Sequence, residues 1–278
     1  MPTLAATQAD ITRLALDAIV KPVLLVTGAS RGIGAATARL AAARGWAVAA
    51  NYTRDVGAAR ALVERIVAAG GDAQAFRADV SDDAQVERLF ADIDERFGLG
   101  ALRGLVNNAG IVDVAARVDA MSRERVARMF AVNVLGAFSC AREAVRRMST
   151  RHGEACFKAA GGGRGGAIVN VSSVAATLGS PAQYVDYAAS KAALDTFTVG
   201  LARELAAEGI RVNAVRPGII DTEIHASGGQ PDRARDLASI IPMQRPGSAD
   251  EVAAAIVWLL SGEASYVTGA IVDATGGR

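Results

Sequence analysis

Tyr187 and Lys191 stand four residues apart, in a stretch whose apolar spacing predicts a helix. Four residues make about one helical turn, so both side chains lie on the same face. A phenol has an unperturbed pKa of about 10, and an ammonium nearby favours the phenolate and lowers that pKa. Such a pair can exchange a proton with an alcohol or a carbonyl oxygen near neutral pH. The spacing often arises by chance, so its meaning depends on the motifs around it.

A glycine-rich turn follows the first strand-like run, at residues 23–27. The segment 27–34 reads TGASRGIG and leads into a helix-like pattern. Glycines let the backbone approach a pyrophosphate, and a helix N-terminus supplies N–H groups and positive potential. The spacing G-x-x-x-G-x-G differs from the G-x-G-x-x-G fingerprint, and glycines alone can form only a tight turn. The position directly after a strand favours a dinucleotide site.

The same turn also matches the G-x-S-x-G nucleophile elbow of hydrolases, with Ser30 at its centre. That mechanism needs an acid and a histidine further along the chain. The sequence holds two histidines, and His152 stands next to a glycine-rich stretch, which leaves His225 as the base. A nucleophile elbow normally follows several strands, whereas this turn follows the first. We therefore rank a hydrolase using Ser30 well below a nucleotide-binding protein.

The end of the second strand-like run bears on the choice between NAD and NADP. An acidic residue about twenty positions after the glycines would bind the adenosine ribose hydroxyls and favour NAD. Tyr52 occupies that position, with Arg54 shortly after it and Arg31 inside the glycine turn. Two guanidinium groups suit a 2′-phosphate, which favours NADP(H) over NAD(H). Alternatively, Arg54 pairs with Asp55 or faces water, or Asp55 itself reaches the ribose.

Composition argues against several other classes of function. The chain has 278 residues, 51% of them hydrophobic, and 30 basic against 29 acidic residues leave a net charge of +1. This balance gives no electrostatic basis for binding nucleic acid or an anionic membrane. Cys140 and Cys156 form no disulfide framework, which indicates free thiols and a cytoplasmic location. Two isolated histidines argue against a metal site, and no apolar run reaches the roughly 18 residues of a membrane span.

Strand-like and helix-like patterns alternate from residue 23 onward. The sequence predicts strands at 23–27, 47–52, 74–78, 102–107, 167–171, 210–215 and 270–272, and helices at 33–43, 56–69, 82–97, 123–148, 187–208 and 249–260. This alternation predicts an α/β fold, a Rossmann-type doubly wound parallel sheet of about seven strands with helices on both faces. We expect a single NAD(P)-binding catalytic domain over 23–278. An extension at 1–22 forms either a short amphipathic helix or a disordered tail.

Two connections interrupt this alternation. Residues 151–166 include a run of glycines and predict a mobile surface loop. Residues 221–245 predict a long flexible region with a short helix, and ligand lids are drawn from such segments.

The motifs together resemble the short-chain dehydrogenase/reductase family, in its single-domain branch. They are TGxxxGxG at 27–34, NNAG at 107–110, a serine at 173, YxxxK at 187–191 and PG at 217–218, in the family's order. The resemblance covers nearly all of residues 23–277, and the stretch 179–191 is most similar to the glucose 1-dehydrogenase-like group. It implies an NAD(P)-dependent oxidoreductase that transfers hydride between the nicotinamide and a carbonyl or secondary alcohol.

The resemblance also implies residue roles. Tyr187 would be the general acid/base, Lys191 would lower its pKa and bind the nicotinamide ribose, and Ser173 would hydrogen-bond the substrate oxygen. Ser172 would serve equally by position alone, and alignment of the family's N-x-S-S motif favours Ser173. Asn133 would hold a water in a proton relay. Together with the glycine turn, the expected cofactor contacts are Gly28, Ser30, Arg31, Gly32, Ile33, Gly34, Arg54, Asp79, Val80, Asn107, Ala109, Gly110, Tyr187, Lys191, Pro217, Gly218, Ile220 and Thr222.

Some alternatives stay open. A 3-oxoacyl-thioester (acyl-carrier-protein) reductase would use the same residues, and its acidic carrier would require a basic rim, for which Arg233, Arg235 and Arg245 are candidates. A non-catalytic NADP-binding regulator would not need the catalytic residues. Asp79 is equally a signal for a helix N-terminus.

The substrate and the assembly follow less directly. The expected pocket residues are Ile111, Val112, Val174, Leu178, Gln183, Tyr184 and Ile219. Their mostly apolar character suits a small ketone or cyclic alcohol. Analogy with the family implies a homotetramer, or a homodimer, joined through helices 123–148 and 187–208.

Overall fold

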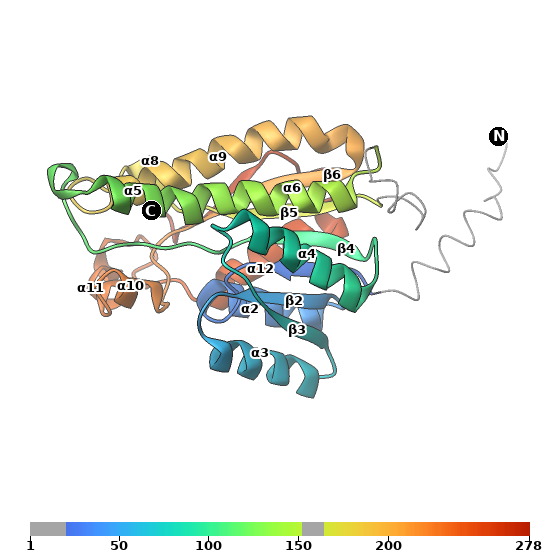
Figure 1. Cartoon of the computed structure of the whole chain (residues 1–278). Helices are drawn as coiled ribbons and strands as arrows, with labels where there is room; N and C mark the ends of the chain where they lie inside the picture. Colours follow the sequence, from blue (N-terminus) through green and yellow to red (C-terminus); the bar gives the residue numbers. More distant parts are fainter. Residues whose placement is uncertain (1–20, 152–163) are drawn as a thin grey trace, which may run out of the picture.

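The computed structural model describes residues 21–151 and 164–278. Residues 1–20 of the expected extension, residues 152–163 of the expected loop, and with them His152 and Cys156, lie outside the described residues, as do the side chains of His225 and Ser227. One sheet of seven parallel strands has the order β3-β2-β1-β4-β5-β6-β7 (Figure 1). The strands are β1 (Val23–Val26), β2 (Ala47–Tyr52), β3 (Asp72–Arg77), β4 (Leu102–Asn107), β5 (Gly166–Val171), β6 (Ile210–Pro217) and β7 (Ile271–Ala274).

The strand order reverses at the centre of the sheet. The chain runs outward from β1 to β2 and β3, then returns to place β4 beside β1 and continues outward to β7. The carboxyl ends of β1 and β4 therefore flank a crevice, which is where open α/β sheets bind ligands. This order confirms the expected Rossmann-type doubly wound fold.

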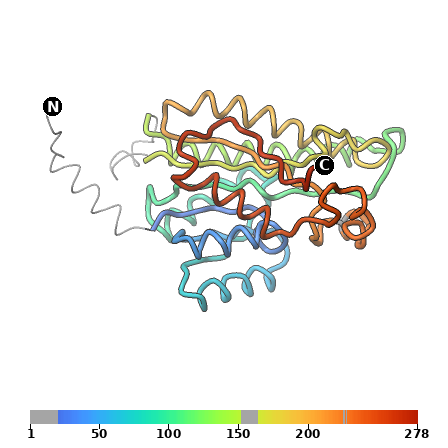
Figure 2. The backbone as a smooth tube through the Cα atoms, turned by 180° about the vertical axis from the view of Figure 1, so that it is seen from behind, coloured from blue at the N-terminus to red at the C-terminus, as the bar shows by residue number. Residues whose placement is uncertain are grey.

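Helices cover both faces of the sheet. One face carries α4 (Asp83–Phe97), α6 (Gly136–Met148) and α9 (Val185–Leu205), and the other carries α2 (Gly32–Ala43), α3 (Val56–Ala68) and α12 (Ala249–Leu260). Within β1, Val23 and Leu25 enter the first core, whereas Leu24 and Val26 enter the second. This alternation follows from the two-residue period of a strand. Figure 1 shows α6 and α9 over the sheet, and Figure 2 shows α12 and α2 from behind.

The long helix expected at residues 123–148 is present with those bounds, but it is not a regular α-helix throughout. α5 (Arg123–Phe130) passes into a π-helical turn at Ala131–Leu135, after which α6 continues to Met148. A π turn holds one residue more than an α turn. It lies where the side chain of Asn133 binds both backbone polar groups of Ile111.

Short helices fill several connections. They are α8 (Ala175–Leu178), α10 (Ile224–Ser227), α11 (Arg233–Asp236) and 3-10 turns at Val118–Ala120, Ala206–Glu208, Ala238–Ile240 and Gly262–Ala264. The segment 221–245 was expected to be flexible with one short helix, but Ala234 and Ile241 pack with Ile219 in a small core of their own. Figure 1 places α10 and α11 beyond one end of the strands.

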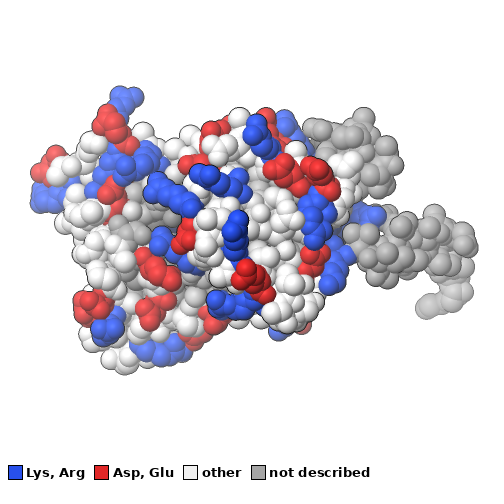
Figure 3. Space-filling model, turned by 60° about the horizontal axis from the view of Figure 1, so that its bottom comes forward, with Lys and Arg blue, Asp and Glu red and all other residues white. Residues whose placement is uncertain are grey.

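No helix of the described residues combines the length and the hydropathy needed to cross a bilayer. Figure 3 shows basic and acidic side chains interspersed over the face in view, with no large area of one sign. The features that position a site are therefore the crevice at the carboxyl edge of the sheet and the connections around it.

Candidate active site

A turn of bare backbone follows β1. Gly28 and Gly32 have φ values of +61° and +54°, which residues other than glycine rarely adopt. A Cβ on Gly34 would lie 2.5 Å from the Gly28 carbonyl oxygen and 2.5 Å from Asn108 Nδ2. α2 begins at Gly32 without a side-chain N-cap, so its first N–H groups are available to a ligand. The three glycines thus fit a pyrophosphate in conformation and in space.

Two asparagines that the sequence reasoning missed hold this turn. The buried Asn51 at the end of β2 accepts from the Gly28 N–H at 3.2 Å and donates to the Ala78 carbonyl at 3.0 Å. Asn108 donates to the carbonyls of Thr27 at 2.9 Å and Gly28 at 3.0 Å. A polar residue inside an otherwise apolar strand is the sequence signal that could have identified Asn51.

Asn107 and Val80, both expected at the cofactor, place their side chains in the core. Asn107 donates to Asn170 Oδ1 at 2.9 Å and to the Ala137 carbonyl at 3.3 Å, which ties β4 to β5 and α6. Val80 is 4% exposed, and a Cβ on Gly136 of α6 would lie only 2.8 Å from it. Both side chains are packed against α6, and a contact of Asn107 or Val80 with the adenosine half of the cofactor stays a prediction.

Asp79 stabilises a turn after β3. Its Oδ1 accepts from the N–H of Ser81 at 3.0 Å and from its hydroxyl at 2.7 Å. This agrees with the alternative that Asp79 is a local signal, although the residue that caps α4 is Asp82. A contact between Asp79 and adenine stays a prediction.

The end of β2 presents Tyr52 where an NAD-binding site would present an acid, and a cation, Arg54, follows two residues later. Tyr52 is the last residue of the strand, and Arg54 after it is exposed. The Asp55 carboxylate accepts from the Ala58 N–H at 2.8 Å and is the N-cap of α3. Asp55 is therefore already engaged in the fold, which weakens the alternative that it binds the ribose.

A cavity of about 540 Å³ opens where β5, α9 and the segment after β6 meet. Ser173 enters it after β5, and Tyr187 and Lys191 enter it from α9. Most expected contacts also line it, namely Ile33, Gly110, Val112, Val174, Leu178, Gln183, Tyr184, Pro217, Gly218, Ile219, Ile220 and Thr222. Ile111, expected to line the pocket, does not, because its backbone is turned toward Asn133. The structure therefore brings the catalytic trio and most of the expected pocket together.

Burial governs the proton affinity of the two central groups. Burial raises the pKa of Tyr187, and its hydrogen bond with Ser173 opposes that rise. Burial lowers the pKa of Lys191 to about 8, which the carboxylate of Asp195 opposes. Lys191 Nζ donates to the Val171 carbonyl at 2.8 Å and lies 5.6 Å from the centre of the Tyr187 ring. The net pKa shift of Tyr187 is upward because burial disfavours the phenolate, and the expectation that Lys191 lowers this pKa stays a prediction.

The structure distinguishes the two neighbouring serines. Ser172 Oγ donates to the Lys191 carbonyl at 3.1 Å, and the residue is 2% exposed. Ser173, in contrast, lines the cavity with Tyr187 and lowers the pKa of that phenol, while its Oγ accepts from the Ala175 N–H at 3.1 Å. Of the two, Ser173 is the one placed to share a substrate oxygen with Tyr187.

Asn133 lies behind the cavity, in the π turn. Its Oδ1 accepts from the Ile111 N–H at 2.8 Å, and its Nδ2 donates to the Ile111 carbonyl and to Ser190 Oγ, each at 3.0 Å. A Cβ on Gly110 would lie 3.4 Å from both Asn133 Oδ1 and Lys191 Nζ. Asn133 thus fixes the segment after β4 against α9, and its role in a proton relay stays a prediction.

A buried ion pair fixes the first turn of α9. Asp186 Oδ2 lies 2.8 Å from Arg125 Nε of α5, and the two side chains are 1% and 12% exposed. Arg125 Nη1 also donates to the Val114 carbonyl at 2.7 Å. Asp186 Oδ1 accepts from the Tyr187 N–H at 2.9 Å. The backbone that carries Tyr187 is therefore anchored to α5 and to the segment after β4.

Comparisons with known proteins decide the family. A family model described as enoyl-(acyl carrier protein) reductase matches residues 28–278. The oxidoreductase YgfF of Escherichia coli, named as uncharacterized, is 54% identical over 256 residues, which cover 92% of this chain and 99% of the relative. The chain belongs to the short-chain dehydrogenase/reductase family. The resemblance seen in its motifs is confirmed, and this short-chain dehydrogenase/reductase is an NAD(P)-dependent oxidoreductase acting on CH–OH or C=O groups.

Two further relatives extend the comparison. The 3beta-hydroxysteroid dehydrogenase 1 of Eggerthella lenta is 41% identical, covering 91% of this chain and 92% of the relative. The crystal structure of a short chain dehydrogenase from Burkholderia cenocepacia in complex with NADP has a TM-score of 0.80 and 36% identity, covering 93% of this chain and 97% of that chain. Membership in the family sets aside the hydrolase alternative built on Ser30.

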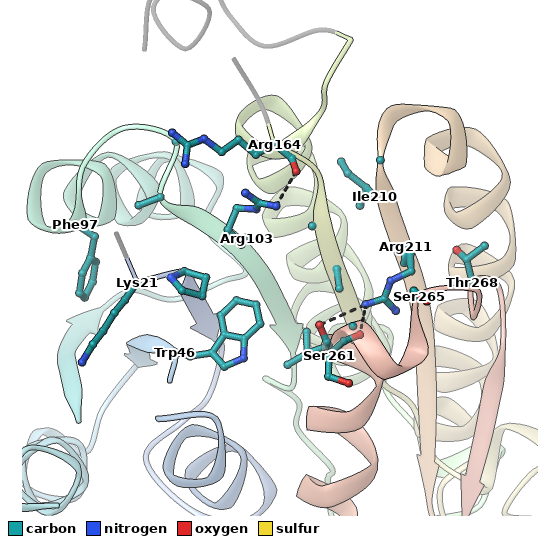
Figure 4. A pocket seen from close by; sticks show the side chains of 18 of the residues that line it. Lys21, Trp46, Phe97, Arg103, Arg164, Ile210, Arg211, Ser261, Ser265 and Thr268 are labelled. Atoms are coloured by element: carbon teal, nitrogen blue, oxygen red, sulfur yellow. Dashed lines mark hydrogen bonds between the residues drawn. The ribbon is translucent and has the colours of Figure 1, made fainter. Parts of the chain in front are cut away.

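A second cavity of this short-chain dehydrogenase/reductase, of about 1030 Å³, is lined by residues at the amino ends of β4, β5 and β6. Figure 4 shows two of its arginines turned toward backbone carbonyls. Arg103 Nη2 donates to Arg164 at 2.7 Å, and Arg211 Nη2 donates to Ser261 at 3.0 Å. The catalytic trio is absent from this lining, so the smaller cavity is the candidate active site.

Neither a metal centre nor a reactive thiol is found in the described part of the chain. No group of three His, Cys, Asp or Glu side chains gathers there as a metal site would require. Cys140 is a free thiol inside α6, and burial raises its pKa to about 12. It is therefore protonated at neutral pH and is not a nucleophile.

Proposed function

We propose that this short-chain dehydrogenase/reductase interconverts a small carbonyl compound and its secondary alcohol, with Tyr187 as general acid/base. The observation that carries the proposal is that Tyr187 and Ser173 line one cavity together, with Ser173 close enough to lower the pKa of Tyr187. Lys191 stands one helical turn beyond Tyr187 on the same lining. Two converging hydroxyls can both contact a single substrate oxygen.

The proton chemistry follows from this arrangement. In reduction, Tyr187 donates its proton to the carbonyl oxygen while Ser173 donates a hydrogen bond that stabilises the developing negative charge. In oxidation, Tyr187 accepts the proton of the alcohol. When bound, the nicotinamide supplies or accepts the hydride. Burial keeps the phenol protonated, which suits the donor, and a protonated Lys191 stabilises the phenolate left after proton transfer.

The residues around the cavity fit a dinucleotide, and we infer a preference for NADP(H). Gly28, Gly32 and Gly34, with Ser30, Arg31 and Ile33 between them, would hold the pyrophosphate. Ala109 and Gly110 would lie under the adenosine half, and Pro217, Gly218, Ile220 and Thr222 would lie against the nicotinamide. The preference is supported by the exposed Arg54, by the engagement of Asp55 as a helix cap, and by the relative from Burkholderia cenocepacia in complex with NADP.

A 3-oxoacyl-thioester reductase is the second candidate, favoured by the acyl-carrier-protein description of the matching family model. The basic rim that an acidic carrier requires is largely neutralised. Arg235 pairs with Asp232 at 3.1 Å, and Arg245 pairs with Glu251 at 2.6 Å. Arg233 lines the cavity itself. These contacts favour a small diffusible substrate over a carrier-bound one.

Assembly and location are also inferred. Leu135 and Phe138 are 60% and 47% exposed, and the Phe138 ring stacks on Phe197 of α9 with 3.8 Å between ring centres. Exposed apolar patches of this kind mark interfaces, and closed symmetry favours a repeated patch. We therefore propose a homotetramer, or a homodimer, joined through α6 and α9. The free Cys140 supports a reducing, cytoplasmic location.

Replacing Tyr187 by Phe tests the reaction. Tyr187→Phe should lower kcat by about 10²–10⁴-fold, because it removes the proton donor, and should leave NADPH affinity within a few-fold. Nicotinamide absorbance would be followed with small ketones, cyclic alcohols, an acetoacetyl thioester and glucose. Tyr266→Phe, at a fully exposed residue, is the matched control. Undiminished turnover by Tyr187→Phe would show that another group handles the proton.

A further inference from the structure

Arg233 is a cation of the substrate cavity that the reaction above does not use. It stands at the start of α11 and lines the cavity. Its Nη2 donates to Gln183 Oε1 at 2.9 Å, its Nη1 donates to Gln230 Oε1, and its guanidinium lies 5.4 Å from the centre of the Tyr184 ring. All three partners are neutral. They hold the guanidinium in place without offsetting its charge.

The other charges around the cavity do not offset it either. Among the described residues of the lining, Lys191, Arg233 and Arg278 are basic and none is Asp or Glu. The neighbouring Asp232 is engaged with Arg235 at 3.1 Å. Arg278 is exposed, so water and salt screen its charge. Arg233 is therefore the oriented positive charge at the end of the cavity formed by α11.

The surroundings of Arg233 narrow the class of ligand. Leu178, Leu237 and Ile240 line the cavity with it, so the part of a ligand that reaches Arg233 is apolar along its length. A guanidinium presents N–H donors in a planar fork that matches the two oxygens of a carboxylate. A phosphate dianion would call for further donors or cations beside Arg233.

We propose that the Arg233 end of the cavity is a carboxylate subsite. The substrate is then a ketone or secondary alcohol with an apolar body and a carboxylate remote from the reacting carbon. This inference rests on the proposed function, because Tyr187 and Ser173 define where the reacting carbon of the substrate lies. Arg233 selects the substrate, whereas Tyr187 and Ser173 act on it.

A binding experiment tests the subsite without turnover. Straight-chain carboxylates from butanoate to octanoate and the amides of the same lengths would be titrated by calorimetry into the full chain, alone and loaded with NADPH. The best carboxylate should bind about tenfold tighter than its amide, as for a hydrogen-bonded charge pair. Equal affinity of carboxylates and amides for the unaltered protein would overturn the proposal.

Three variants separate charge from structure. Arg233→Gln removes the charge, and Gln183→Glu keeps the contact to Arg233 but neutralises it, so both should lose the preference for carboxylates. Arg235→Gln removes a neighbouring exposed arginine and should keep it. If Arg233 only fastened α11 to Gln183, Gln183→Glu would retain the preference, which would refute the subsite even if Arg233→Gln were too unstable to measure.

Turnover then distinguishes the subsite from the reaction. Methyl ketones from 4-oxopentanoate to 8-oxononanoate and their methyl esters would be compared by kcat/KM with NADPH, and the best acid should exceed its ester by about tenfold. Reduction of both series at equal kcat/KM would contradict the carboxylate subsite and would still support the proposed reaction. Preferential binding of carboxylates without reduction of any ketone would support the subsite and contradict the proposed reaction.

Discussion

Lys191 is almost completely buried, and its ammonium donates to a backbone carbonyl while the nearest acidic influence comes from Asp195. Burial lowers its pKa to about 8, whereas an unfolded lysine titrates near about 10.4. Between these pH values the unfolded chain binds a proton that the folded chain does not. The free energy of unfolding therefore rises with pH across this window. The stability gained in this way is lost as the pH falls back through about 8.

This titration is measurable. Between pH 8 and pH 10 the rise due to Lys191 should be about 2 kcal/mol, from the size of the pKa change, and Lys191→Met should abolish it. The raised pKa of Tyr187 acts in the opposite direction, but only above about pH 10. Urea unfolding of the cofactor-free protein at several pH values would check this. If the free energy of unfolding changed with pH in the same way in the unaltered protein and in Lys191→Met, the lowered pKa of Lys191 would be contradicted.

Arg54 tests the cofactor preference. Arg54→Ala should weaken NADPH about tenfold, because a charge-assisted hydrogen bond to the 2′-phosphate is lost, and should hardly change NADH. Arg44→Ala, at the C-cap of α2, is the matched control because it lies at the end of the helix away from the glycine turn. Fluorescence titration with both nucleotides measures the effect. Equal losses of affinity for NADPH and NADH would show that Arg54 does not bind the 2′-phosphate.

Sequence spacing predicted the residues whose chemistry is written into a local motif. Tyr187, Lys191 and Ser173 fall within short patterns, and the structure brings all three to one cavity. Asn51 and Asn108 were missed because their importance lies in contacts with the glycine turn, which is distant in sequence. The pKa directions could not be predicted either, because they depend on burial and not on residue type.

At the scale of elements, α9 depends on its first turn being anchored to α5. Asp186→Ala would leave Arg125 buried without its carboxylate, and should lower the free energy of unfolding by about 3–5 kcal/mol. The exposed pair of Arg39 and Asp250 offers the matched control, since Asp250→Ala should cost about 1 kcal/mol or less. Urea unfolding of both variants provides the comparison. Similar losses would show that the buried pair is replaceable by water.

Elements with several full periods were the predictable ones. The strand Leu102–Asn107 and the helix Ala249–Leu260 lie at the predicted bounds. The short helix Ala175–Leu178 was not predicted, because four residues give no helical period. The π turn at Ala131–Leu135 was missed for a different reason. It coincides with the contact of Asn133 with Ile111, which no local pattern records.

At the scale of the whole molecule, the exposed Phe138, which stacks on the partly buried Phe197, is expected to be covered by another copy of the chain. Phe138→Glu would place a charge in that interface and should convert a tetramer into a smaller species. Val67→Glu, at a residue 53% exposed on α3, adds the same charge elsewhere and should leave the assembly unchanged. Light scattering after size-exclusion chromatography gives the masses. An unchanged mass for Phe138→Glu would move the interface off α6.

The π turn also restricts how this chain can change in length over evolution. Loss of one residue between 131 and 135 would restore a regular helix, because a π turn holds one residue more than an α turn, and the helix on either side could keep its register. The widened turn that carries Asn133 to Ile111 and Ser190 would then be gone. Insertions and deletions are therefore tolerable in surface loops but not in this helical segment, whose residue count is as constrained as the identity of Asn133.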